Sequence, residues 1–331
     1  MKVAVLLLNG MQSFEVACAC QVFGYASSIA PPIQVVLVSP QSLVRLDWGV
    51  SVVAEPLTSM VRADVVVIPG FSSMDALQKS MDRTQSAARQ AVLAAHAAGA
   101  QVVSLCVGAF WLASTGLLDE TDATTHWRRC RDLAKAYTNV RVVTNVLYTH
   151  DVERRVWTSA GETAALDCCL AVVAFSLGQA TAAAAARQLV LPATRPGGQA
   201  QFVPPRWGPN PAPGDLARLQ CLVRDDLGFA WTLAAMARAA QMSTRTLQRR
   251  CEQHWGTSPL KWLIGERLDA AKELLQATDE SIEAIAHHVG FGTSDLLRKH
   301  FSSVLGITPS QYRLAFAADG ARRHESDRRS R

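Results

Sequence analysis

The sequence predicts an α/β fold, with a parallel sheet between helices in its N-terminal part, followed by an all-α domain. Three observations predict this arrangement. Apolar runs rich in β-branched residues alternate with alanine-rich helical stretches over the first 190 residues, a proline-rich segment then interrupts regular structure, and only helical patterns follow, two of them similar to each other. A chain of 331 residues suits two domains, because single cores rarely grow beyond about 250–300 residues.

The N-terminal part, residues 1–190, has the pattern of a flavodoxin-like sandwich. A helical stretch such as residues 84–98 between strand-like runs is typical of a parallel sheet covered by helices. The strand-like runs are residues 3–8, 35–38, 65–68, 102–105 and 140–143.

Residues 191–214 are predicted to be a linker, because seven prolines and several glycines prevent a regular element of useful length. The domain after the linker is expected at residues 215–316. The last residues, 317–331, form a basic tail that we expect to be flexible.

Composition narrows the function classes. The net charge of +5 is small, so bulk charge says little about nucleic acid binding. The eight cysteines form no C-x-x-C pair, so neither a disulfide framework nor a metal site is expected, and no cofactor is implied. The apolar run that follows Met1 is too short to span a membrane, which favours a cytoplasmic protein without a membrane partner.

An internal duplication marks the C-terminal domain. Residues 233–262 align with residues 282–313, with apolar positions and turn residues in step. The offset is 49 from Leu233 to Ile282 and 50 from Gly256 to Gly306, so the second copy carries one extra residue in its turn. Two copies in step favour a structural unit used twice.

Each copy has the layout of a helix-turn-helix, at about residues 232–254 and 281–304. A short helix with small residues precedes a tight turn and a second helix opened by a hydroxyl side chain. In the first copy Leu247 and Cys251 are spaced to face the core, which turns arginine and glutamine side chains outward, where they match guanine and adenine edges. The alternative for either copy alone is an ordinary solvated helix face.

The same residues resemble the DNA-binding domain of the AraC/XylS regulators, a typically bacterial family. The motifs that carry the resemblance are MSTRTLQRRC, GTSPLKWLIGERLDAAKELL, SIEAIAHHVGF and FSSVLGITPSQYR. The resemblance implies a homodimeric transcription regulator, expected to be an activator, with promoter DNA and RNA polymerase as partners. By resemblance, the DNA contacts fall on Thr244, Arg245, Gln248 and Arg249 in the first unit and on Ser294, Asp295, Arg298 and Lys299 in the second.

In the N-terminal part, residues 102–110 (VVSLCVGAF) predict a strand that turns sharply into a helix, with Cys106 at the turn. A cysteine at the first turn of a helix is exposed to the positive end of the helix dipole, which lowers the thiol pKa. The pattern therefore favours a reactive thiolate at a position where α/β domains also bind ligands.

Residues 1–190 resemble the class I glutamine amidotransferase-like, or ThiJ/PfpI-type, superfamily. The matching stretches are VVVIPG, CVGAFWLASTGLLD, ATTHW and TSAGETAALDCCLAVV. By resemblance, Glu15 approaches Cys106, and Val107 stands where the catalytic enzymes often carry histidine. The whole arrangement is similar to AraC-family regulators with such an N-terminal domain, which implies a small effector such as an amino acid or a quaternary amine.

Several interpretations of this site stay open. The first is a catalytic set of Cys106, His126 and Glu15, for an amidase, a peptidase or a glyoxalase-like enzyme. The second is oxidant sensing by Cys106. The third is a structural or dimerising domain without a ligand. We expect a ligand-sensing domain and no enzyme. The predicted effector pocket consists of Glu15, Phe71, Cys106, Val107, His126 and Trp127.

Aromatic residues near this site have two interpretations. Trp48, Phe71 and Trp127 are expected to be core residues, with an aromatic wall for a cationic ligand as the alternative.

Overall fold

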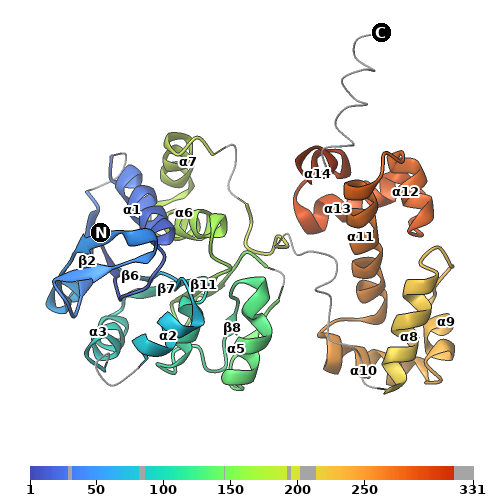
Figure 1. The fold of residues 1–331 in the computed structure, drawn as a ribbon, viewed down its shortest axis with the longest axis horizontal. Helices are drawn as coiled ribbons and strands as arrows, with labels where there is room; N and C mark the ends of the chain where they lie inside the picture. Colours follow the sequence, from blue (N-terminus) through green and yellow to red (C-terminus); the bar gives the residue numbers. More distant parts are fainter. Residues whose placement is uncertain (29–31, 82–85, 145, 192–194, 202–213, 317–331) are drawn as a thin grey trace, which may run out of the picture. The chain divides into compact units, whose positions relative to one another are not determined.

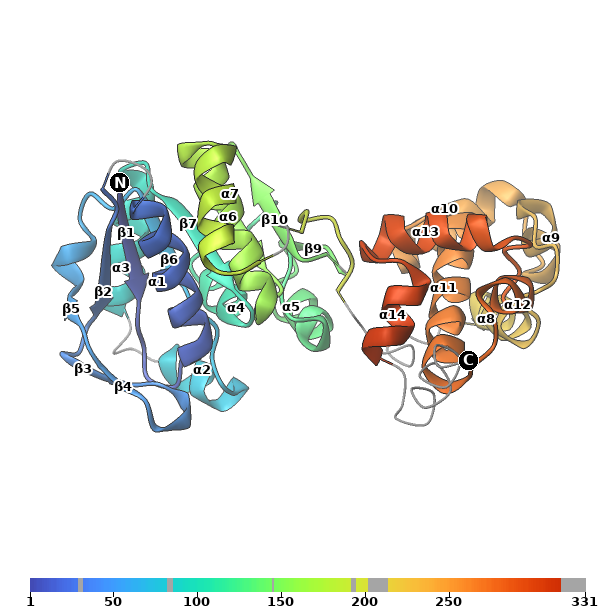
Figure 2. The same ribbon diagram turned by 90° about the horizontal axis from the view of Figure 1, so that it is seen from above.

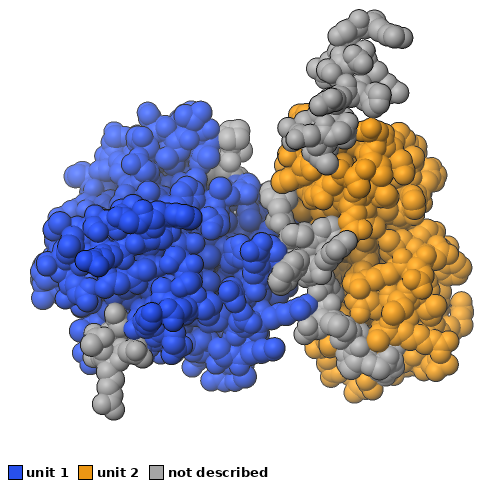
Figure 3. Space-filling view, in the orientation of Figure 1, with its two compact units in different colours: residues 1–201 blue, residues 202–331 orange. Residues whose placement is uncertain are grey.

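The computed structural model describes residues 1–28, 32–81, 86–144, 146–191, 195–201 and 214–316. The chain forms two compact units, residues 1–201 and 202–331, which are coloured separately in Figure 3 and are described one at a time below. Of the predicted linker and tail, residues 192–194, 202–213 and 317–331 lie outside the described residues.

A seven-stranded sheet forms the centre of the first unit, in the order β10-β11-β7-β6-β1-β2-β5. All neighbouring strands pair in parallel except β10, which is antiparallel to β11 at one edge. The strands are β1 (Lys2–Leu6), β2 (Gln34–Ser39), β5 (Glu55–Pro56), β6 (Val65–Ile68), β7 (Gln101–Leu105), β10 (Tyr148–Asp151) and β11 (Val156–Ser159). The central strands β1, β6 and β7 are almost entirely buried, as expected for a sheet covered on both faces.

Helices cover the sheet on both faces (Figure 1). Helices α1 (Ser13–Ser27), α6 (Thr163–Leu177) and α7 (Gln179–Gln188) pack against one another on one face. Helix α3 (Ser86–Ala97) lies on the other face, where it contacts β7. The shorter helices of this unit are α2 (Met74–Ser80), α4 (Gly108–Ala113) and α5 (Cys130–Ala136).

Two small sheets lie outside the central one. The strands β3 (Leu43–Arg45) and β4 (Ser51–Val53) form an antiparallel hairpin, and β8 (Asp122–Ala123) pairs in parallel with β9 (Arg141–Val142). The run at residues 140–143 was expected in the main sheet, but it contributes only β9 to the small sheet. The antiparallel pair of β10 and β11 was not predicted, because β11 contributes only four residues and lacks a long apolar run.

In its described residues the second unit is all helical, as predicted. Its helices are α8 (Gly214–Asp225), α9 (Leu233–Ala239), α10 (Thr244–Trp255), α11 (Pro259–Ala277), α12 (Ile282–His288), α13 (Ser294–Leu305) and α14 (Pro309–Phe316). Figure 1 shows α10 and α13 at opposite ends of α11, and both contact it. The predicted fold class is confirmed for both units.

Equivalent residues of the two repeats form equivalent cores. Leu247 and Cys251 of α10 are fully buried, and so are their counterparts Leu297 and Phe301 of α13. Helices α8 and α11 are joined by Arg224, whose guanidinium donates to the nearly buried carboxylate of Glu266 at 2.6 Å. The second unit therefore has a hydrophobic core of its own.

Candidate functional site

Cys106 occupies a sharp turn between β7 and α4. Its φ of 48° lies in the left-handed region, which non-glycine residues rarely adopt, and its backbone N–H donates to the Ser159 carbonyl at 2.9 Å. The turn brings the first helical residue so close to β6 that a Cβ on Gly108 would lie 2.7 Å from the carbonyl oxygen of Ile68. The predicted strand-to-helix elbow is present, and the surrounding packing maintains its strain.

Glu15 lies beneath this turn and has no solvent exposure. Its two carboxyl oxygens accept hydrogen bonds from backbone N–H groups, one from Gly70 at 2.6 Å and one from Glu162 at 3.0 Å. Burial raises the pKa of the Glu15 carboxyl to about 7, against the two hydrogen bonds, which lower it. The buried carboxyl therefore keeps its proton to a higher pH than a carboxyl in water does.

Two glycines leave space for Cys106 and Glu15 to lie side by side. A Cβ on Gly70 would lie 2.8 Å from the Cβ of Cys106 and 2.9 Å from Glu15 Oε2. A Cβ on Gly161 would lie 2.2 Å from the Cβ of Cys106 and 2.5 Å from Glu15 Oε1. Both residues must therefore lack a side chain for the cysteine and the carboxyl to fit. Both glycines lie in motifs that carried the family resemblance, Gly70 at the end of VVVIPG and Gly161 within TSAGETAALDCCLAVV, but the sequence alone did not single them out.

The electrostatics of Cys106 differ from the expectation of a lowered pKa. Burial, followed by the neighbouring Glu15 carboxylate, raises the pKa of the Cys106 thiol well above its ordinary value, although the backbone N–H of Val107 donates to it. The dipole of the six-residue helix α4 is too small to offset that desolvation. The thiol is therefore protonated at neutral pH in this state of the protein.

The segment 124–127 runs past the Cys106 turn. Thr125 is fully buried, and its hydroxyl donates to the Cys106 carbonyl at 2.7 Å. The ring of His126 instead interacts within its own turn, where Nδ1 accepts from the Arg128 N–H at 3.3 Å and the ring lies 5.4 Å from that of Trp127. Desolvation and the nearby arginines lower the pKa of His126. Thr125, which we did not include in the predicted pocket, thus makes the direct contact.

The remaining predicted pocket residues have different environments. Phe71 follows β6 and is 2% exposed, and Val107 is buried at the start of α4. Trp48 does not join them, because its side chain is 91% exposed beside the β3–β4 hairpin. The expectation that Trp48 is a core residue is wrong: the residue lies at a tight turn with a φ of 53°, which directs the ring into solvent.

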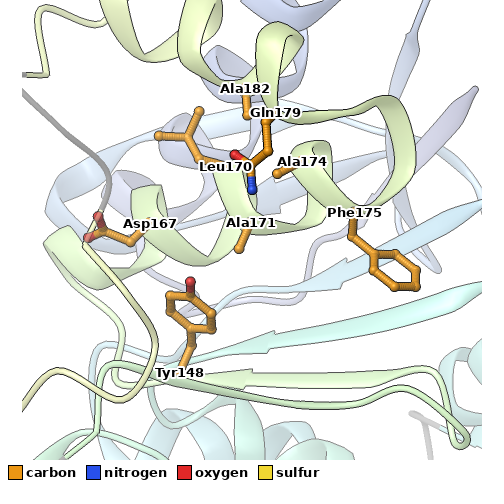
Figure 4. Close-up of a pocket in the computed structure, with 8 residues that line it drawn as sticks. All are labelled: Tyr148, Asp167, Leu170, Ala171, Ala174, Phe175, Gln179 and Ala182. Carbon is orange, nitrogen blue, oxygen red and sulfur yellow. The ribbon is translucent and has the colours of Figure 1, made fainter.

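A pocket of about 250 Å³ lies elsewhere in the first unit, between β10 and the helices α6 and α7 (Figure 4). Figure 4 shows the Tyr148 ring on one side, Phe175 and Gln179 on the other, and Asp167 at one end. The pocket is lined by Tyr148, Asp167, Leu170, Ala171, Ala174, Phe175, Gln179 and Ala182. No residue of the predicted effector pocket lines it.

The second unit presents the first predicted DNA-reading helix, α10. Ser243 caps it, with its hydroxyl accepting from the Thr246 N–H at 3.1 Å, and Gly256 ends it in a left-handed conformation. Because Leu247 and Cys251 point into the core, the opposite face is open to solvent. The exposed residues on that face include Thr244, Arg245, Gln248 and Arg249.

The second predicted reading helix, α13, has the same design but different surface chemistry. Thr293 caps it, accepting from the Leu296 N–H at 3.3 Å. The Arg298 guanidinium already donates to Asp295 at 3.0 Å and to Ser294 at 3.3 Å on the same helix. Lys299 is exposed beside them. The second helix therefore presents an internally paired arginine.

The described residues contain no helix that is both long and apolar enough to cross a membrane. Likewise, no group of three or more histidine, cysteine or acidic side chains in the described part of the chain is arranged to hold a metal ion.

The first unit is an α/β domain with a cysteine on a strand-to-helix elbow. The second unit is a duplicated helix-turn-helix domain, so the chain combines two domains of different kinds. A family model of the DJ-1/PfpI family matches residues 1–175, and one of a helix-turn-helix domain matches residues 236–315. The chain belongs to the DJ-1/PfpI family, and its C-terminal unit is an AraC-type helix-turn-helix domain. Both resemblances predicted from the motifs are confirmed.

Curated relatives that match this chain are named as transcriptional regulators. The chain is 28% identical over 215 residues to the HTH-type transcriptional regulator ArgR of Pseudomonas aeruginosa, covering 65% of this chain and 64% of that protein. It is 27% identical over 277 residues to the HTH-type transcriptional regulator Rv1931c of Mycobacterium tuberculosis, covering 77% and 96%. The chain spans between 58% and 64% of the length of the first curated relatives that it matches.

Among solved structures, a ThiJ/PfpI family protein from Pseudomonas syringae is similar to the first unit. The TM-score is 0.50 at 25% identity, and the match covers 59% of this chain and 76% of that one. This likeness supports the fold assignment of the first unit.

Proposed function

We propose that the protein is a sequence-specific, DNA-binding transcription regulator whose N-terminal unit responds to a small metabolite. The observation that carries the proposal is the pair of capped helices α10 and α13, each of which buries one apolar face and exposes arginine on the other. This face chemistry matches base edges in the major groove. The relatives named above are transcriptional regulators, which supports the same proposal.

The connecting helix supports two reading helices acting on one face of DNA. Helix α11 has 19 residues, which span about 28 Å at about 1.5 Å per residue. Successive major grooves on one face of B-DNA recur about every 34 Å. A helix of nearly that length, with a reading helix at each end, suits the simultaneous insertion of α10 and α13.

For the first unit we propose ligand sensing at the Cys106 site and no catalytic turnover. The protonated state of the Cys106 thiol and the hydrogen bonding of His126 within its own turn both disfavour a thiolate-imidazole pair. Cys106 follows the carboxyl end of the parallel strand β7, which is where α/β domains bind ligands. An amino acid or a quaternary amine is the effector class that the family resemblance implies.

The domain limits carry over as part of the proposal: a sensing domain at residues 1–190, a linker at 191–214, a DNA-binding domain at 215–316 and a basic tail at 317–331. The proposed partners are promoter DNA, a second copy of the chain and RNA polymerase. The proposed action is activation of transcription in the cytoplasm. These statements follow from the family resemblance.

Fluorescence anisotropy with DNA from upstream of the protein's own gene tests the DNA-binding proposal. We expect Arg249→Ala to weaken specific binding by about 5- to 150-fold, the range for a lost base-reading contact. The matched control is Arg218→Ala, which removes an exposed arginine from α8, outside both reading helices. Equal affinities of the wild type and Arg249→Ala would refute the assignment of α10 as a reading helix.

A substrate panel tests the sensing proposal. We expect no turnover of amide, peptide or 2-oxoaldehyde substrates by the full chain. Turnover that Cys106→Ser abolishes while DNA affinity is unchanged would establish the enzyme alternative instead.

A further inference from the structure

Residues 195–201, which the sequence placed in the linker, lie against the first unit as an ordered strap. The Gly197 carbonyl accepts from the backbone N–H groups of Leu147 at 2.8 Å and Tyr148 at 3.3 Å, next to the start of β10. A Cβ on Gly197 would lie 2.7 Å from the Tyr148 ring and carbonyl, so only glycine permits this approach. The strap is therefore closely packed against the α/β unit at Gly197.

The first anchor of the strap is Arg195. Its guanidinium donates to Asp167 Oδ2 from Nη2 at 2.7 Å and from Nε at 2.9 Å, and its backbone N–H donates to Oδ1 at 2.8 Å. Asp167 is nearly buried and lines one end of the pocket in Figure 4. Two guanidinium N–H groups on one oxygen and the backbone N–H on the other use both oxygens of a carboxylate that is mostly withdrawn from water, and these charge-assisted hydrogen bonds hold the strap at this end.

The second anchor is Gln201, the last described residue before the segment that leads to the second unit. Its side chain is almost fully buried. Its amide nitrogen donates to the carbonyls of Thr125 at 3.1 Å and Val146 at 2.9 Å, and its amide oxygen accepts from the Trp127 N–H at 2.9 Å. Both donor positions of the amide are thus used on backbone groups of the first unit.

One residue separates this anchor from the Cys106 turn. Thr125 accepts from Gln201 through its carbonyl and donates to the Cys106 carbonyl through its hydroxyl. Since Thr125 is fully buried, neither contact exchanges freely with water. A displacement of the Cys106 turn therefore reaches Gln201 through a single residue.

We propose that the strap, residues 195–201, carries the effector signal out of the first unit. This inference rests on the proposed function as an effector-responsive regulator. A ligand that binds against the Cys106 turn displaces it, Thr125 moves with it, and Gln201 loses the geometry of its three hydrogen bonds. Release of residues 196–201, as far as the Arg195 anchor, then lengthens the tether to the second unit by up to about 22 Å, at about 3.3–3.6 Å per residue.

Coupling between two sites is reciprocal, so it can be tested from the strap toward Cys106 without knowing the effector. In the full chain we expect Gln201→Ala to raise the rate of iodoacetamide labelling at Cys106, read by peptide mass spectrometry, by about tenfold. This factor corresponds to one net hydrogen bond, because of the three that Gln201 loses only the one to the Thr125 carbonyl leads to the Cys106 turn. The matched control is Gln101→Ala, which removes an amide bonded to Ser176 and Trp157, away from the strap. We expect no change there.

A double-mutant cycle tests whether Thr125 carries the coupling. Thr125→Val keeps the shape but removes the hydroxyl, so in that background Gln201→Ala should no longer change the labelling of Cys106. Its control is Thr121→Val, which removes an equally buried hydroxyl that donates to the Leu118 carbonyl. An equal effect of Gln201→Ala in both backgrounds would overturn the relay.

Hydrogen exchange of a peptide covering residues 195–201 shows whether each variant has released the strap. Faster exchange of this peptide in Gln201→Ala with unchanged labelling of Cys106 would refute the proposal. If Gln201→Ala does not fold, Gln201→Glu keeps the acceptor for Trp127, loses both donors and should give the same result. Promoter affinity is measured separately on the same proteins, so failure of DNA binding refutes the proposed function and leaves the relay to be judged on its own.

Discussion

Glu15 gives a prediction in which the folded protein should lose stability as the pH rises. The carboxyl is fully buried, and its pKa is raised from 4.5 to about 7. Between these values the unfolded chain releases the proton while the folded chain keeps it, so the free energy of unfolding falls as the pH rises. The contribution is complete below about pH 4.5 and is lost as the pH passes 7. A shift of about 2.5 pKa units corresponds to about 3 kcal/mol.

The test is Glu15→Gln in the full chain, because glutamine has no charge to gain. The free energy of unfolding of the wild type minus that of the variant should fall by about 3 kcal/mol between pH 4.5 and pH 8. Below pH 4.5 the variant should be less stable by about 1–3 kcal/mol, since its amide NH₂ group faces a backbone N–H of Gly70 or Glu162.

Urea unfolding can be followed in this unit alone. Cys168 and Cys169 of α6 are fully buried, so a short thiol-labelling pulse at one fixed pH reports the unfolded fraction of the first unit. Asp75→Asn, which neutralises a carboxylate that is 74% exposed, is the control and should show no comparable change. A difference between wild type and Glu15→Gln that stays constant within about 0.5 kcal/mol over this pH range would show that Glu15 ionises in the folded protein as it does in water.

Three further predictions concern the second unit and the strap anchor. Ser243→Ala removes the cap of α10 and should lower the free energy of unfolding by about 1 kcal/mol; a thermal melt unchanged within error would contradict the capping role. Arg298→Ala should reduce promoter affinity less than Arg249→Ala, because Arg298 must first leave Asp295; anisotropy showing the reverse order would refute this. Asp167→Asn weakens the Arg195 pair and should lower the free energy of unfolding by about 2 kcal/mol, as for the loss of a hydrogen bond to a charged group; unchanged hydrogen exchange of residues 195–201 would contradict its anchoring role.

Periodicity and local motifs were sufficient to predict much of the fold. The duplication predicted equivalent cores, and the structure places Leu247 opposite the exposed arginines just as the helical spacing requires. A hydroxyl cap was also predicted for the second helix of each repeat, and the structure has Ser243 and Thr293 at these positions; the prediction was possible because the capping hydrogen bond depends on residues only three positions apart.

Contacts between distant segments could not be predicted in the same way. The sequence pattern contains no signal that joins Gln201 to Thr125, because a proline- and glycine-rich stretch looks the same whether or not it packs against a neighbour. The pKa of Cys106 was misjudged for a related reason: the dipole of the following helix is visible in the sequence, whereas the burial that outweighs it comes from β6, β11 and α1 together. For Trp48 the error was in the opposite direction. We expected the side chain to be buried because it is aromatic, but it lies at a tight turn and is exposed.

The paired arginine on α13 has a consequence for how promoters would change over evolutionary time. A base change in the DNA beneath α10 would remove a contact made by an arginine such as Arg249, which has no acidic partner among the described residues of its own helix. Arg298 of α13 differs, because it can return to Asp295 when its base is lost. Within the proposed function, mutations in the half-site under α13 would therefore be tolerated more often. Aligned target promoters should then show one well-preserved half-site and one that drifts.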